Sequence, residues 1–518
     1  MLRSHRGGII AFLLAITGFL ASAFVTQRVF EAIPHIEDEI AYVWQAEALI
    51  EGHLKVASPP QPKSFLVPFV VDYQGERFSK YPPGWPVVLA LGILSGLRAW
   101  VNPLLAGLGV WLTYQLGKRF FSHLVGLLAA SLTVTSPFLL MNSGSLLSHP
   151  FGLVLSSIFA LGWLEAFWQN KAEEPVAGLP GARRRWGYTV IAALALGSLI
   201  LTRPFTALAV ALPFAIHGLV IVFRADRAIR IRLLVFCLLA ILFIGLYFLW
   251  QYMLTGDALL NPYTLWWPYD RIGFGPGIGH TPTGHTLQLA WINTRFSLQG
   301  GSSDLFGWGK FSWVLLPFGI WTTRRNLKGL LLGSVVLSLV LAYMAYWIGA
   351  TLFGPRYYYE GLYSLTLITA AGICWLAGWP VKAGLRFTAY TGWRKLRPLL
   401  VTLILGVIVG INLALYLPIR LDGMFGLYDI ERADQLPFET PAAQALTPAL
   451  VIVHVDRWME YGALLDLENP DLTTPFIFAW NNNPFTDALL ADAFPGRTVY
   501  HYYPSKPFQL YREPLPEP

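Results

Sequence analysis

Long apolar stretches alternate with short polar ones along most of the chain. Many of these stretches approach the ~20 residues that an α-helix needs to cross a bilayer, so the pattern predicts a polytopic α-helical membrane protein. The candidate spans are about residues 8–27, 100–117, 123–141, 149–168, 188–202, 204–222, 232–254, 305–322, 328–348, 360–379 and 398–417, which makes 11. We therefore interpret residues 1–417 as a transmembrane domain.

The polar stretches between the spans differ in the sign of their charge. Five basic connections fall on one side of the predicted topology: Gly117–Arg119, Arg183–Arg185, Arg224–Arg232, Arg324–Arg325 and Arg394–Arg397. With Arg3, Arg6 and neighbouring residues, that side holds 20 of the 37 Lys and Arg, whereas 26 of the 30 acids fall on the other side. The positive-inside rule then predicts a cytoplasmic N-terminus and places loops 28–99 and 255–304 outside. Residues 85–97 are too short to cross, so they are predicted to be re-entrant or interfacial.

The last hundred residues have a different pattern. Apolar strand-like runs at 450–455, 476–480 and 498–502 alternate with helix-like segments at 458–467 and 485–494. This order predicts a small extracytoplasmic α/β domain over residues 418–518. The fold class expected for the whole chain is thus an all-α polytopic membrane protein with a small outer α/β domain.

Composition narrows the class of protein further. The chain of 518 residues is 55% hydrophobic and 13% charged, with a mean hydropathy of +0.51, which argues against a soluble protein and indicates an integral protein of the plasma membrane. Cys237 and Cys374 both lie in apolar spans, which argues against a disulfide framework or a Cys-based metal site. The net charge of +7 is explained by the basic cytoplasmic loops, so we expect no nucleic-acid partner.

Carboxylates are concentrated in the first outer loop. Eight of the 30 acids lie between Glu31 and Glu76, and the run Glu37–Glu39 follows His35-Ile36. Carboxylates held against a membrane are costly, so they are candidates for function. Asp38 and Glu39 are the candidate catalytic residues. The alternative is that the three acids only begin a helix, whose dipole favours them.

That helix would also carry an apolar stripe. Ile36, Ile40, Val43 and Trp44 share one side of it, and this stripe would be able to rest on a membrane surface.

Isolated cations and aromatic residues occur at the predicted outer ends of the spans. A carboxylate can deprotonate an acceptor hydroxyl, and cations can hold a departing phosphate. The alternative for each cation is a simple interfacial anchor. The candidate residues for binding a lipid phosphate or a sugar donor are Lys80, Tyr81, His149, Arg203, Arg271 and Arg356.

These motifs resemble those of the GT-C membrane glycosyltransferases, and most closely the bacterial family 39 enzymes that include aminoarabinose-lipid transferases and protein O-mannosyltransferases. The resemblance rests on the first span, on the pair Asp38-Glu39 and on the element Phe78-Ser79-Lys80-Tyr81-Pro82-Pro83. It implies that Asp38 is the base and that Lys80 binds the lipid phosphate. Ser79 stands where those transferases have glutamate, so no metal ligand is assigned and a divalent cation stays only an option.

The resemblance and the charge pattern together favour one function. The chain is interpreted as an inverting glycosyltransferase that moves a sugar from a polyprenyl-phosphate donor to an envelope glycan, lipid or protein acceptor on the outer face. One alternative is a glycolipid transporter or flippase, which should carry polar residues in mid-membrane and internal pseudo-symmetry. The other alternative is a non-catalytic protein of envelope assembly.

Overall fold

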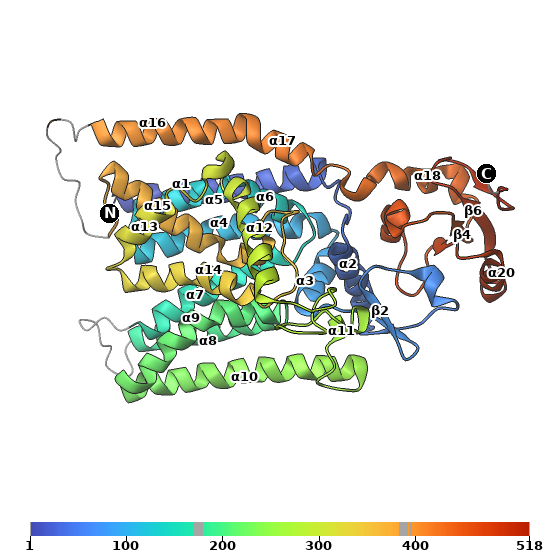
Figure 1. The fold of residues 1–518 in the computed structure, drawn as a ribbon, viewed down its shortest axis with the longest axis horizontal. Helices are drawn as coiled ribbons and strands as arrows, with labels where there is room; N and C mark the ends of the chain where they lie inside the picture. Colours follow the sequence, from blue (N-terminus) through green and yellow to red (C-terminus); the bar gives the residue numbers. More distant parts are fainter. Residues whose placement is uncertain (1, 169–179, 383–391, 393–395, 517–518) are drawn as a thin grey trace.

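The computed structural model describes residues 2–168, 180–382, 392 and 396–516. Its long helices run side by side in one bundle, and the C-terminal domain lies at one end of that bundle (Figure 1). We call this end the domain end. The bundle helices are α1 (Leu2–Arg28), α4 (Val101–Phe120), α5 (His123–Val134), α6 (Pro137–Gly144), α7 (His149–Phe167), α8 (Pro180–Ile200), α9 (Pro204–Arg224), α10 (Arg227–Thr255), α13 (Leu316–Thr323), α14 (Leu327–Tyr343), α15 (Leu362–Ala377) and α16 (Leu396–Ile411).

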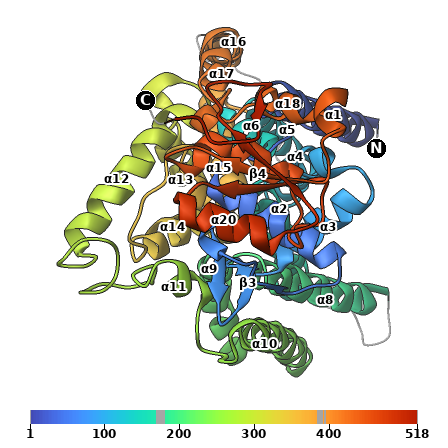
Figure 2. The ribbon, with the colours of Figure 1, turned by 90° about the vertical axis from the view of Figure 1, so that its right-hand side faces the viewer.

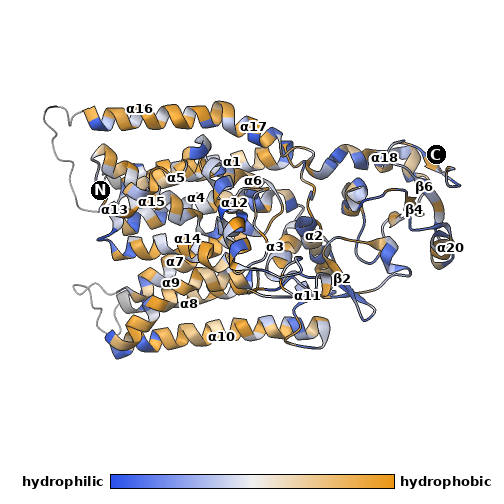
Figure 3. Ribbon diagram, viewed as in Figure 1, coloured by the Kyte–Doolittle hydropathy of each residue, from blue (hydrophilic) through white to orange (hydrophobic). Residues whose placement is uncertain are grey.

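Hydropathy follows this division of the molecule. The bundle helices are predominantly apolar and the C-terminal domain is more polar (Figure 3). Within the described residues, six helices are long and apolar enough to cross a membrane, or seven if α5 and α6, bent by 56° at their junction, form one broken span. The ends of α4 and α9, the start of α10 and the link α13–α14, which carry basic residues, lie at the end opposite the C-terminal domain (Figure 1). These basic residues therefore gather at one end of the bundle, while the side of the membrane that this end faces stays a prediction.

Helices lie in every predicted span, but 123–141 is broken between α5 and α6, α14 ends at Tyr343 within 328–348, and 305–322 is α-helical only in its last part. There the chain turns at Gly307 (φ +68°) and Gly309 (φ +57°), forms the 3₁₀ turn η3 (Gly309–Phe311), and becomes α-helical only at Leu316. The prediction of one continuous helix in this stretch is therefore wrong.

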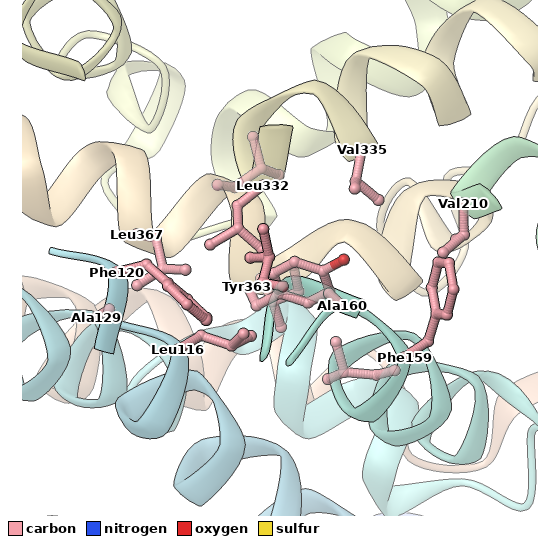
Figure 4. Packing of buried hydrophobic residues seen from close by; sticks show 14 of the residues in the cluster. Leu116, Phe120, Ala129, Phe159, Ala160, Val210, Leu332, Val335, Tyr363 and Leu367 are labelled. Carbon is pink, nitrogen blue, oxygen red and sulfur yellow. The ribbon is translucent and has the colours of Figure 1, made fainter. Parts of the chain in front are cut away.

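The bundle core lies where α4, α7, α14 and α15 meet. Leu116 and Phe120 of α4, Phe159 and Ala160 of α7, Leu332 and Val335 of α14, and Tyr363 and Leu367 of α15 converge in it (Figure 4). Helix α16 stands at the edge of the bundle and exposes one apolar face along its length (Figure 1). It continues through the π-helical turn η6 (Asn412–Tyr416) into α17 (Leu417–Asp422), so the predicted domain boundary at residue 417 falls inside a continuous helix.

Shorter elements cover the domain end of the bundle. They are α2 (Glu37–Ile50), β1 (Val56–Ala57), η1 (Pro62–Phe65), β2 (Val70–Tyr73), β3 (Glu76–Ser79), α3 (Gly84–Leu94), η2 (Arg98–Trp100), α11 (Pro262–Trp266), α12 (Leu287–Asp304) and η4 (Arg356–Gly361). Helix α3 has 11 residues and is too short to cross a membrane, as predicted for residues 85–97. The two ribbon views show α12 running across the bundle axis (Figures 1 and 2).

The C-terminal domain has the predicted alternation of strands and helices. Its elements are η7 (Leu427–Asp429), η8 (Arg432–Gln435), α18 (Leu436–Glu439), α19 (Pro441–Gln444), β4 (Ala449–Val453), η9 (Trp458–Leu467), β5 (Phe476–Trp480), α20 (Pro484–Ala493), β6 (Thr498–Tyr502) and β7 (Leu510–Tyr511). The sheet order is β5-β4-β6-β7, with β4 parallel to both β5 and β6, and with β7 antiparallel to β6. The predicted architecture, an all-α polytopic domain with a small α/β domain, is therefore confirmed.

The first loop at the domain end links the two parts of the molecule. Phe65 is buried in the C-terminal domain against Leu450, Ile477 and Leu490. The Tyr461 hydroxyl also donates a hydrogen bond to the Leu66 carbonyl at 2.6 Å. Because β2 and β3 follow directly, the C-terminal domain holds the segment that leads to Lys80.

Candidate active site

Helix α2 carries Asp38 in its first turn, at the junction between the bundle and the C-terminal domain (Figure 1). Three consecutive acids begin this helix, where its dipole favours negative charge. The Tyr81 hydroxyl donates a hydrogen bond to Asp38 Oδ1 at 2.7 Å, and Arg356 Nη2 lies 3.5 Å from Asp38 Oδ2. The Asp38 and Arg356 side chains are each 17% exposed, so the pair is enclosed but still reachable.

The surrounding cations determine the protonation state of Asp38. Burial on its own would raise the pKa of this carboxyl, but Arg356, the Tyr81 hydroxyl, Lys80 and Arg203 hold the pKa below its ordinary value. Asp38 is therefore ionised at neutral pH. An ionised carboxylate in a partly enclosed site can accept a proton from a hydroxyl group.

Glu39 has a different environment from Asp38. Its carboxylate accepts hydrogen bonds from the backbone N–H groups of His35 (2.9 Å), Ile36 (3.2 Å) and Leu146 (2.6 Å). Burial raises the pKa of Glu39 to about 7, although these three donors oppose the shift. Glu39 thus ties the start of α2 to the α6–α7 link, and the contacts seen here are those of a positioning residue.

The apolar stripe on α2 does not rest on a membrane surface. Ile36, Ile40, Val43 and Trp44 are at most 6% exposed and pack inside the protein. That prediction is wrong because the links and loops of the domain end cover the helix.

The segment between β3 and α3 brings Lys80 and Tyr81 next to α2. Strand β3 ends at Ser79, whose N–H donates to the Gln45 side chain of α2 at 2.9 Å. Two prolines then stiffen the chain before Gly84, whose N–H donates to the Leu201 carbonyl at 2.8 Å. A Cβ atom on Gly84 would lie only 2.4 Å from Thr202 Oγ1, so this close approach requires glycine.

Lys80 lies in an aromatic box and is only 2% exposed. Its ammonium is 3.5 Å from the centre of the Phe69 ring and 4.8 Å from that of Trp267, with Tyr81 and Tyr263 also near. Its counter-ion is Asp270, whose Oδ2 is 3.4 Å from Nζ. Burial lowers the pKa of Lys80, and Asp270 opposes that shift.

Asp270 is itself fixed by residues that follow α14. The Tyr346 hydroxyl and the Trp347 indole N–H each donate to Asp270 Oδ1 at 3.0 Å. The loop after α10 is therefore anchored at both Lys80 and the end of α14.

Arg203 is the third cation near Asp38. It precedes α9, and its Nε lies 3.2 Å from Glu360 Oε1. The same oxygen of Glu360 is 3.1 Å from Nδ1 of His149, and Glu360 is fully buried. Gly152 makes room for this carboxylate, because a Cβ there would lie 2.8 Å from Glu360 Oε1.

The structure gathers most, but not all, of the sequence-predicted site residues. Asp38, Tyr81 and Arg356 are in direct contact, Lys80 and Arg203 act on the Asp38 charge, and His149 joins through Glu360. Arg271 is exposed and separate from these contacts. The catalytic and binding roles assigned to all these residues stay predictions.

Sequence reasoning missed two carboxylates of the site. Glu360 is the single acid at the start of an otherwise apolar span, which is a signal for function in a membrane protein. Asp270 lies in a polar loop and carries no such signal, since its role depends on a contact 190 residues away in the chain.

Metal binding finds no support among these residues. Within the part of the chain that the structure describes, no three His, Cys, Asp or Glu side chains are grouped closely enough to hold a metal ion. We therefore derive no step through a divalent cation.

Comparison with known proteins identifies the fold. No protein-family model matches the chain, and a search of curated proteins finds no match to its sequence. Among solved structures, ArnT from Cupriavidus metallidurans bound to undecaprenyl phosphate matches with a TM-score of 0.57 at 14% identity, over 94% of this chain and 89% of ArnT.

A second likeness is to an archaeal protein. The oligosaccharyltransferase AglB from Archaeoglobus fulgidus, in complex with an inhibitory peptide and a dolichol-phosphate, matches with a TM-score of 0.50 at 13% identity, over 94% of this chain and 69% of AglB. At these identities the likenesses show the fold. The predicted resemblance to GT-C membrane glycosyltransferases is confirmed at that level, and the chain is an integral membrane protein.

Proposed function

We propose that this protein, which has the fold of the GT-C glycosyltransferases, is an inverting glycosyltransferase that uses a polyprenyl-phosphate sugar as donor. The observation that carries the proposal is the partly enclosed Asp38 carboxyl at the domain end of the bundle, with Arg356 at 3.5 Å and with Lys80 and Arg203 near enough to lower its pKa. The acceptor is an envelope glycan, lipid or protein. Structures of this fold that hold undecaprenyl phosphate or a dolichol-phosphate support a lipid-linked donor.

The reaction is a single displacement. An acceptor hydroxyl gives its proton to Asp38 while its oxygen attacks the anomeric carbon of the sugar. The bond between that carbon and the phosphate oxygen breaks, and the polyprenyl phosphate leaves with the electron pair. Because attack and departure occur on opposite faces, the anomeric configuration inverts.

The three cations differ in how fully they are already paired with carboxylates, and therefore in how readily they can bind the departing phosphate. Lys80 is paired with Asp270, and Arg203 is paired with Glu360. Arg356 makes one long contact with Asp38, and its Nη1 has no hydrogen-bond partner within the described residues. Arg356 is therefore the cation best placed to move onto a phosphate, where its planar fork allows bidentate contacts. Lys80 and Arg203 add a positive field that stabilises the leaving group.

The proposed orientation places this chemistry outside the cytoplasm. The basic helix ends and the basic α13–α14 link lie at the opposite end of the bundle, so the positive-inside rule assigns the domain end to the outer face of the plasma membrane. The donor reaches the site from the membrane, where its prenyl chain is dissolved.

A reconstituted assay tests the proposal against the transporter alternative. Purified protein in proteoliposomes is given a polyprenyl-phosphate sugar labelled in the sugar, with an extract of envelope acceptors. We expect free polyprenyl phosphate and labelled acceptor to accumulate together. Movement of intact donor across the bilayer, without release of polyprenyl phosphate, would show a transporter instead.

A further inference from the structure

The strand order of the C-terminal domain contains a change of direction. The segment after β4 contains η9, whose Tyr461 and Leu464 pack on one face of the sheet with Val451. The segment after β5 contains α20, whose Leu490 packs on the other face with Leu450. In the order β5-β4-β6, the chain moves from β4 to one neighbour and then crosses to the other. The carboxyl ends of β4 and β6 thus form a topological switch point, where open α/β sheets bind ligands.

Two histidines and a tyrosine lie at this switch point. His454 directly follows β4, His501 is in β6, and Tyr503 directly follows β6. His454 Nε2 and His501 Nδ1 are 2.8 Å apart and share a hydrogen bond. The rings of His454 and Tyr503 are stacked, with centres 4.3 Å apart and planes 13° apart.

This cluster is open to solvent at one side. His454 and Tyr503 are half-buried, and Asp456 beside them is exposed. Asn481 follows β5 and is fixed next to the end of β4, because its N–H donates to the Val453 carbonyl at 3.0 Å. An incoming ligand therefore meets imidazole, phenol and amide groups at one edge of the sheet, where the Tyr503 hydroxyl also accepts a hydrogen bond from the Leu515 N–H at 2.8 Å.

The charge of His454 and His501 determines which ligands can bind at this edge of the sheet. Burial and the neighbouring His501 lower the pKa of His454 to about 4, and burial also lowers the pKa of His501, so both rings are neutral at pH 7. Their mutual hydrogen bond uses one nitrogen of each ring and leaves His454 Nδ1 and His501 Nε2 for other partners. Neutral donors and acceptors on the half-buried, stacked rings of His454 and Tyr503 match the hydroxyl groups and the apolar ring face of a sugar, and these rings offer no net positive charge to a phosphate or carboxylate.

We propose that the edge formed by His454, His501, Tyr503 and Asn481 binds an uncharged carbohydrate. Nothing in the proposed transfer reaction requires this second site. If the bound carbohydrate is also the acceptor of the transferred sugar, that role rests on the proposed function. Binding of the carbohydrate at this edge does not rest on it.

The test measures binding by the full-length protein in lipid nanodiscs, which avoid sugar-based detergents. The probe is an array of defined neutral and acidic oligosaccharides. The variants are His454→Ala, Tyr503→Ala and the milder Tyr503→Phe, and the matched control is His53→Ala, an exposed histidine of the first loop at the domain end.

We expect neutral oligosaccharides to bind. Their affinity should fall about tenfold or more in His454→Ala and Tyr503→Ala, by less in Tyr503→Phe, and not in His53→Ala. The proposal is overturned if no oligosaccharide binds, if only acidic ones bind, if a peptide library binds in their place, or if His454→Ala and Tyr503→Ala both bind as the wild type does. Asp38→Asn should still bind the same glycans, so a failure of catalysis and a failure of this site are distinguishable.

Discussion

The ion pair between Arg356 and Asp38 should control the pH dependence of activity. Asp38 can act as a base only while it is ionised, so activity must fall as the pH drops through its pKa. The cations around Asp38 lower that pKa, and the acidic limb of the wild-type profile should therefore lie at unusually low pH. Arg356→Gln keeps a polar side chain of similar length and removes the largest of the opposing charges.

The size of the change follows from the geometry. Two unit charges at the observed separation of 3.5 Å interact by about 5 kcal/mol at an effective dielectric constant of ~20. At 1.36 kcal/mol per pKa unit this corresponds to about 3.5 units, which is an upper limit because both side chains are partly exposed and solvent screens the pair. Opposite charges at such distances typically shift a carboxyl pKa by about one to three units. We therefore expect the acidic limb to move upward by about one to three pH units.

The assay is the pH profile of kcat/KM for the polyprenyl-phosphate donor, which reports groups of the free enzyme. Loss of a phosphate contact in Arg356→Gln lowers the whole profile, but it does not move the limb. The control is Arg271→Gln, which removes an exposed arginine of the neighbouring loop and should leave the limb in place. An unshifted limb in Arg356→Gln, or one displaced to lower pH, would refute the reasoning.

Three further predictions follow from the contacts at the site. Glu39→Gln should lower the free energy of unfolding by about 1.5–3 kcal/mol, because one of three charge-assisted hydrogen bonds is lost; thermal unfolding in detergent measures this, and unchanged stability would contradict the positioning role. Lys80→Ala and Arg356→Ala should each reduce donor turnover about 10–100-fold, the double variant should lose less than the product of the two, and strictly multiplicative losses would separate these residues from a common phosphate. Phe65→Ala should lower the free energy of unfolding by about 3–5 kcal/mol and speed hydrogen exchange across residues 61–69. Unchanged exchange in this segment would show that the C-terminal domain does not hold the loop.

Much of the fold follows from local patterns in the sequence. Apolar length predicts the spans, and the alternation of strands and helices predicts the C-terminal domain, because both depend on neighbouring residues. The prediction of a helix over residues 305–322 also fails for a local reason, because Gly307 and Gly309 adopt positive φ values and interrupt the helix. Apolar composition alone does not predict such an interruption of a helix.

The candidate site was predictable only in part. Asp38, Lys80, Tyr81, Arg203 and Arg356 stand out as charged or polar groups at the ends of apolar spans, and the structure places them around one carboxylate. Their partners depend on contacts between distant segments, which no pattern along the chain encodes. The aromatic box around Lys80 and its ion pair with Asp270 therefore emerge only from the folded chain.

The most direct test of the central claim is donor turnover by Asp38→Asn. This substitution keeps the shape of the side chain and its place beside Tyr81 and Arg356, but it removes the basic oxygen. Transfer of sugar from a polyprenyl-phosphate donor should fall by about 100-fold or more in detergent-solubilised protein whose thermal unfolding matches that of the wild type. Near-normal turnover in Asp38→Asn, and above all a loss in Glu39→Gln in its place, would contradict the account.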